Sequence, residues 1–365
     1  MKKILLSCLG LLLFATACDT NPNLNNCDFD ESAMLTNYAD EIIIPRFGVL
    51  KIGVAHVNGA ITAFNANPTV GTLNEVRVAF GPAYLAYQRC SSFAFGPALI
   101  GGVPFRDRFN TFPTSTTNIE SAISNGSQVS TSVKSAVGFP AVEYLIFGDG
   151  DTDQELVDGF SIAPNAEARR TYLQQLGEEL LAVATQIETD WNTYRNTFVS
   201  NTGTAAGSSI SLLINQFNFD FEILKNFKFK IPLGKLNGGI VLPQNVEGLY
   251  SGGAAQLALE QAESFRDIFH GTGENQANGS GLYEYLICLD TQYEDRPLAN
   301  VISERFNDII AAVNAVPDPM AETLVSDKPI VDAAYTEMQM MVPLIKHDMT
   351  SALGVQISYQ DNDGD

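Results

Sequence analysis

Apolar residues recur at steps of three and four residues along most of this chain, and that period restricts it to a helical architecture. The segments from Asp30 to Asn65 and from Ala166 to Ser200 are the longest examples, and Pro45 is expected to kink the first. The same period predicts further helices over 72–95, 138–148, 208–229, 246–269, 282–316 and 330–353. Strand signals are few, and none is paired with a hairpin turn. We therefore expect an all-α fold.

The first residues have the three parts of an export signal. Lys2 and Lys3 give a charged start, residues 4–14 are almost wholly apolar, and small residues lead into Cys18. The apolar run is shorter than the roughly 20 residues that a membrane-spanning helix needs. This order resembles the bacterial lipobox, in which Cys18 would be acylated. An ordinary cleaved signal before an unmodified cysteine is the alternative.

This pattern sets the expected organisation of the chain. We expect a signal peptide over 1–17 and a polar, lipid-anchored tether over 18–29. The remaining length is large for one core and suggests two helical bundles, over 30–160 and 161–365. The expected location is the cell envelope, with the outer membrane as the expected membrane.

Acidic residues outnumber basic ones by 42 to 21, which gives a formal net charge of −21. Such a surface argues against nucleic acid as a partner, because nucleic acids are polyanions. Of the five cysteines, Cys8 would leave with the signal and Cys18 would carry lipid. Cys27, Cys90 and Cys288 remain, so at most one disulfide can form within the chain. Buried free thiols are expected for Cys90 and Cys288.

One short pattern occurs twice. Val-Glu-x-Leu-x-x-Gly spans 142–148 and again 246–252, each time shortly after a proline, Pro140 or Pro243. Together with a similar order of helices, the repeat favours duplication of a four-helix bundle. In that case Glu143 and Glu247 would occupy related positions and could face one cleft. On a helix, Ser251 would lie on the same face as Glu247.

Several stretches resemble the imelysin family of exported and lipid-anchored bacterial proteins. They are NYADEIIIPRF at 37–47, Arg77 with Tyr84 and Tyr87-Gln88, Phe95-Gly96-Pro97, GFPAVEYLIFG at 138–148, KIPLGKLNGG at 230–239, the block from Pro243 to Gly271, and the chain end from Ser351. The resemblance covers nearly the whole mature chain. It implies two helical bundles with a site in the cleft between them.

The resemblance breaks at one position of the family's Gly-x-His-x-x-Glu motif. Gly138 and Glu143 are present, but Pro140 stands where the histidine is expected. A His and a Glu three residues apart share one helical face and can share a metal or a proton, which proline cannot do. The family is classed among metallopeptidases, but His-Glu-x-x-His is absent here, and the three histidines have no ligand spacing.

The candidate binding residues are therefore Gly138, Glu143, Glu247 and Ser251, with the two glutamates as candidate metal ligands. For each glutamate, an acid that stabilises a helix N-terminus is an equal alternative. The acidic runs 149–153 and 361–365 lack the complete spacing of a calcium loop and are read as solvated loops. A cluster of phenylalanines is read as core rather than as a cofactor site, and it comprises Phe217, Phe219, Phe221, Phe227 and Phe229.

These observations favour a non-catalytic binding lipoprotein of the envelope. Resemblance to imelysins implies that it binds, or assists the uptake of, iron, haem or another ligand such as calcium. Envelope iron-uptake proteins are the implied partners. A metallopeptidase and a pure protein-interaction module are the alternatives.

Overall fold

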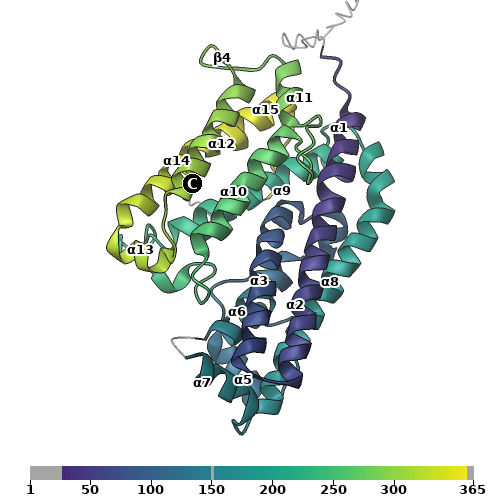
Figure 1. Cartoon of the computed structure of the whole chain (residues 1–365). Helices are drawn as coiled ribbons and strands as arrows, with labels where there is room; N and C mark the ends of the chain where they lie inside the picture. The colour runs from purple at the N-terminus through teal and green to yellow at the C-terminus, as the bar shows by residue number, and fades with distance from the viewer. Residues whose placement is uncertain (1–26, 149–151, 360–365) are drawn as a thin grey trace, which may run out of the picture.

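The computed structural model describes residues 27–148 and 152–359. The predicted signal peptide, Cys18, most of the tether and most of both acidic runs lie outside the described residues. Within them the fold is all-α, as predicted, and strands are confined to two short hairpins (Figure 1).

The first part of the described chain alternates long and short helices. Its elements are α1 (Glu31–Asn37), η1 (Tyr38–Ile43), α2 (Ile44–Ala66), α3 (Val70–Cys90), η2 (Ser91–Phe93), η3 (Gly96–Ala98), β1 (Leu99–Ile100), β2 (Val103–Pro104), α4 (Arg106–Phe109), α5 (Thr116–Ser124), η4 (Lys134–Ala136), α6 (Gly138–Phe147) and α7 (Asp153–Ser161). The segment between the helices predicted over 72–95 and 138–148 therefore contains the short helices α4 and α5.

The second part continues in the same manner. Its elements are α8 (Ala166–Ser200), α9 (Ser209–Ile223), η5 (Leu224–Lys230), η6 (Pro243–Asn245), α10 (Ala254–His270), α11 (Leu282–Cys288), β3 (Gln292–Tyr293), β4 (Arg296–Pro297), α12 (Leu298–Asn314), α13 (Met320–Ser326), α14 (Lys328–Pro343), η7 (Leu344–Met349) and α15 (Thr350–Leu353).

The first long helix changes its winding beside a proline. η1 is a π-helical segment that ends just before Pro45, so α1, η1 and α2 form one continuous helix. Proline lacks an amide hydrogen, and its ring clashes with the carbonyl four residues earlier in a regular α-helix. A wider π turn relieves that clash. At Pro343 the order is reversed, because the π-helical η7 follows the proline instead of preceding it.

The core begins with α2, which packs against α3 on one side and α8 on the other. The stretch Glu31–Ala66 is long and apolar enough to cross a membrane by length and composition. Its apolar stripe is nevertheless buried in the core, with Phe47, Leu50 and Phe64 fully inaccessible to solvent. Core packing therefore accounts for the apolar character of this helix.

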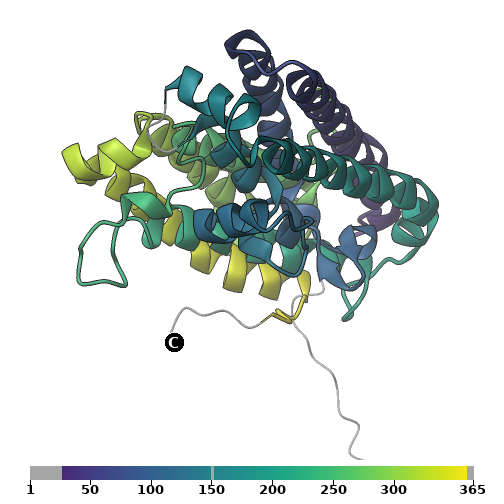
Figure 2. The same ribbon diagram turned by 90° about the horizontal axis from the view of Figure 1, so that it is seen from below.

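A second group of helices is formed by α10, α12 and α14, and α10 contacts α3 of the first group. Figure 1 shows these helices beside the group of α2, α3 and α8. Figure 2 shows α2 and α3 at the opposite edge of the molecule from the yellow segment that contains α14 and α15. Although α8 begins just after the predicted boundary at residue 160, it packs along α2. The domain limits and the duplication stay predictions.

Two predicted helices differ from the structure because of their turns. The helix predicted over 246–269 begins only at Ala254, since Gly248 and Gly252 have positive φ angles of 64° and 74°. Residues with a Cβ rarely adopt such angles, so the turn favours glycine at both positions. The helix predicted over 282–316 is divided by the β3–β4 hairpin.

The prediction that Cys288 is a free thiol is wrong. Cys27 and Cys288 form a disulfide, whereas Cys90 is a buried free thiol as expected. Their Cα atoms are 5.3 Å apart although 261 residues separate them in sequence. A pairing at this separation depends on the tertiary fold, and spacing alone could not reveal it. The bridge fixes the start of the described chain to the end of α11.

Candidate functional site

The glycine of the motif sets the position of α6. Gly138 has a φ of 78°, and a Cβ there would lie 2.4 Å from the carbonyl oxygen of Phe109. Only glycine allows α6 to begin this close to the backbone of α4. Gly138 therefore acts as a spacer behind the site.

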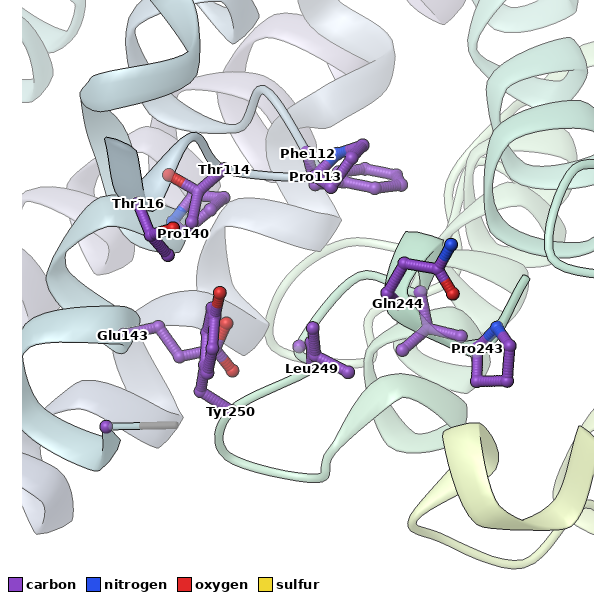
Figure 3. Close-up of a pocket in the computed structure, with 13 residues that line it drawn as sticks. Phe112, Pro113, Thr114, Thr116, Pro140, Glu143, Pro243, Gln244, Leu249 and Tyr250 are labelled. Atoms are coloured by element: carbon purple, nitrogen blue, oxygen red, sulfur yellow. The ribbon is translucent and has the colours of Figure 1, made fainter. Parts of the chain in front are cut away.

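Pro140 and Glu143 lie on the same face of α6 and both border a pocket of about 580 Å³. Segments from both parts of the chain form its wall. The lining residues are Phe112, Pro113, Thr114, Thr116, Pro140, Glu143, Gly148, Pro243, Gln244, Val246, Gly248, Leu249 and Tyr250. Figure 3 shows Pro140, Thr114 and Thr116 on one side of this main pocket, and Leu249, Gln244 and Pro243 on the other. The position of the replaced histidine thus faces the pocket.

The carboxyl group of Glu143 is held by the turn that contains the second copy of the repeat. Its Oε1 accepts hydrogen bonds from the backbone N–H of Ser251, at 2.9 Å, and from Ser251 Oγ, at 2.5 Å. The side chain is 1% exposed. Burial raises the pKa of Glu143 to about 7; the bonds from Ser251 oppose this rise, and the nearby Glu247 adds to it.

Glu247 lies in a different environment, although it is equally buried. Its Oε2 is 2.5 Å from Lys228 Nζ, so the two side chains form a buried ion pair. Its Oε1 accepts hydrogen bonds from Gln88 Nε2, at 2.8 Å, and Asn110 Nδ2, at 2.6 Å. Lys228 also donates to Gln88 Oε1, and Tyr84 donates to Asn110 Oδ1. We call these five residues the buried polar network; it joins α3, the segment after α4, η5 and the turn at 246–252.

The structure brings together some predicted residues and separates others. Glu143 and Ser251 are in direct contact, which the helical reading of 246–269 did not predict. The expected shared helix face of Glu247 and Ser251 is wrong, because both residues lie in turns. Sequence reasoning missed Lys228, Gln88 and Asn110 as partners of Glu247. The position of Lys228 between two phenylalanines was the available signal, because a buried lysine needs an anionic partner.

The donor set does not fit a resident metal ion. Oε1 of Glu143 already accepts two bonds from Ser251, and Glu247 is neutralised by Lys228. Across residues 27–148 and 152–359, no group of three or more His, Cys, Asp and Glu side chains is arranged to hold a metal. Zinc needs about three protein ligands and calcium needs six to eight oxygens. Pro140 supplies no donor at the position where the motif calls for histidine.

Comparison with known proteins agrees with the fold and with the family resemblance noted in the sequence. The family model described as Imelysin (Peptidase_M75) matches residues 43–340. Iron-regulated protein A of Synechococcus elongatus is 22% identical over 339 residues, which covers 88% of this chain and 85% of that protein.

Two solved structures share the fold. One is described as an iron-regulated protein A precursor from Parabacteroides distasonis, with a TM-score of 0.73 and 17% identity over 89% of this chain and 95% of that chain. The other is an imelysin-like protein from Psychrobacter arcticum, with a TM-score of 0.69 and 16% identity over 90% of this chain and 97% of that chain. The family match spans most of the chain, and the chain therefore belongs to the imelysin family.

Proposed function

We propose that this protein is a non-catalytic binding lipoprotein of the bacterial cell envelope, and that it takes a small organic ligand into the main pocket. An iron chelate without net negative charge is the first candidate ligand. The observation that carries the proposal is the pocket of about 580 Å³ with one buried carboxyl, Glu143, at its wall. That volume lies within the range of about 300–1,000 Å³ that is common for small-molecule sites.

The charges around the pocket narrow the class of ligand. None of its described lining residues is Lys, Arg or His, so an anionic ligand would find no cationic partner there. With a pKa of about 7, Glu143 is protonated in a large fraction of molecules near neutral pH. Thr114, Thr116 and Gln244 provide further hydrogen-bonding groups. These groups suit a ligand that is neutral or weakly cationic and rich in hydrogen-bonding atoms.

The link to iron comes from the relatives, one of which is named for regulation by iron. A bare metal ion is disfavoured by the donor set, and the same argument disfavours a metallopeptidase. An iron chelate brings its own ligands and needs no protein donors. Haem is a weaker candidate because its two propionates would lack cations at the pocket wall.

Location in the envelope is supported by two independent features. The first residues have the pattern of a lipoprotein signal that ends at Cys18. The Cys27–Cys288 disulfide is the kind of bond that persists in oxidising compartments outside the cytoplasm. Metabolic labelling with a fatty acid should mark the wild type and a Cys8→Ser variant, but not Cys18→Ser. Equal labelling of all three proteins would contradict the anchor.

Ligand binding is tested by thermal shift of the full chain carrying Cys18→Ser. The probes are the ferric complex of desferrioxamine B, haem, Fe²⁺ and Ca²⁺. We expect the ferric chelate to raise the melting temperature, and Gln244→Trp to abolish the shift by filling the pocket. Gln292→Trp, at an exposed site in the β3–β4 hairpin, is the matched control and should leave the shift intact. A shift with Fe²⁺ alone that Gln244→Trp does not alter would contradict the proposal.

A further inference from the structure

A second cavity, of about 210 Å³, lies between η5 and the segment that follows α4. Phe219, Ile223 and Phe227 form one wall at steps of four residues along α9 and η5. Phe112 belongs to the opposite wall and also lines the main pocket, so the two cavities adjoin there. Figure 3 shows Phe112 on the side of the main pocket away from Glu143. We call this second cavity the aromatic pocket.

The phenylalanine cluster noted in the sequence contains both buried and partly exposed side chains. Phe217, Phe221 and Phe229 are buried in the core, as predicted, and the first two pack on Phe265. Phe219 is partly exposed, and Phe227 is 49% exposed. Core packing therefore explains three members of the cluster but not the stripe that lines the aromatic pocket. Exposed apolar side chains gathered around a cavity indicate a binding site more often than isolated ones do.

Charged side chains at the same cavity indicate the charge of the ligand that it would bind. The Arg106 guanidinium lies over the Phe219 ring, with 4.7 Å between its carbon and the ring centroid. Lys134 also lines the cavity, and its Nζ is 2.5 Å from Asp107 Oδ2. Arg106 lies 3.7 Å from the other oxygen of Asp107. Two cations thus share one carboxylate, and the local charge is positive in a chain whose net charge is −21.

We propose that the aromatic pocket binds a single aromatic ring that carries an anionic group, as in an aryl carboxylate. A cavity of about 150 Å³ with apolar walls can hold one benzene ring, so the volume here suits one substituted ring. The ring would stack among Phe112, Phe219 and Phe227, where aromatic contacts add to burial. Its anionic group would lie toward Arg106 and Lys134. This site adjoins the main pocket at Phe112, but the proposal does not depend on the function proposed for that pocket.

The test is isothermal titration of the full chain carrying Cys18→Ser with three probes at pH 7. Benzoate has both the ring and the charge, benzyl alcohol has only the ring, and acetate has only the charge. We expect benzoate to bind most tightly, benzyl alcohol more weakly and acetate not measurably. Phe227→Ala should lower the affinity for benzoate about tenfold, since it removes one aromatic ring from the wall of the pocket.

Charge recognition is tested separately by Arg106→Gln and Lys134→Gln. Each should lower the affinity for benzoate about fivefold, which is the effect expected of one partly exposed ion pair. The affinity for benzyl alcohol should stay nearly unchanged. Tyr293→Ala and Arg296→Gln, both in the distant β3–β4 hairpin, are the matched controls and should change nothing. The proposal is overturned if benzoate fails to bind, or if it binds Phe227→Ala as tightly as the wild type. Equal affinity for benzoate and acetate would also overturn it.

Discussion

Glu143 and Glu247 occupy the same position in two copies of one seven-residue pattern, yet the structure gives them different surroundings. Glu143 lies on a helix, borders the main pocket and accepts hydrogen bonds from Ser251. Glu247 lies in a glycine-rich turn and is paired with Lys228 inside the buried polar network. Local sequence therefore fixed neither the backbone nor the electrostatic role of the second copy. One carboxyl borders the main pocket, and the other holds distant segments together.

The largest expected effect is the loss of stability when the buried ion pair of Lys228 and Glu247 is broken. Lys228→Met leaves the carboxylate of Glu247 buried without its cation, which we expect to cost about 3–5 kcal/mol of unfolding free energy. Urea unfolding followed by circular dichroism measures this cost. The control is Lys51→Met, which breaks the more exposed pair of Lys51 and Glu188 and should cost less than about 1 kcal/mol.

A double variant, Lys228→Met with Glu247→Leu, should recover much of the lost stability, because it removes both charges together. If Lys228→Met were no more costly than Lys51→Met, the structural role of the pair would be contradicted. Glu247 would then have no structural role to set it apart from Glu143.

The next effect concerns the pH dependence of stability. The pKa of Glu143 in the folded chain, about 7, lies above its ordinary value of 4.5. Folding therefore favours the protonated acid, and this contribution is complete below pH 4.5 and is lost as the pH rises through 7. Glu143→Gln has no carboxyl to titrate at this position. The free energy of unfolding of this variant, relative to that of the wild type, should therefore be higher at pH 8 than at pH 5, by at most about 3 kcal/mol.

Urea titrations at the two pH values measure that difference. Glu247→Gln is the informative comparison, since it leaves Lys228 buried without an anion and should destabilise the chain at both pH values. An identical response of the two variants to pH would show that the carboxyls are equivalent, contrary to the structure.

The smallest effect is a gain of metal affinity. Pro140→His supplies the donor that the motif lacks here, and Ser251→Ala removes one of the two hydrogen bonds to Glu143 Oε1. The double variant should therefore bind Zn²⁺ at least about tenfold more tightly than the wild type. Pro243→His is the control, because it places the same donor at the main pocket but on the side away from Glu143. Titration calorimetry measures both affinities. An equal increase in Zn²⁺ affinity in the two variants would mean that Glu143 does not contribute to the metal site.

The helices were predictable because their apolar stripes repeat over many residues, as in α2 and α8, and helix patterns need no long-range information. The motif from Gly138 to Glu143 was recognisable for the same reason, since its spacing lies within one helix. The environment of Glu247 was not predictable. Gln88 is 159 residues away, and positive φ angles at two glycines replaced the expected helix with turns. The Cys27–Cys288 disulfide likewise depends on contacts between distant segments.

The most direct test is the protonation state of Glu143 itself. A carbon-13 NMR titration of the glutamate side-chain carboxyls, assigned by the signal that disappears in Glu143→Gln, measures its pKa in the folded chain. We expect a titration midpoint near pH 7 for this carboxyl, because it is buried beside the main pocket without a cation. A midpoint near the ordinary value of 4.5 would contradict it.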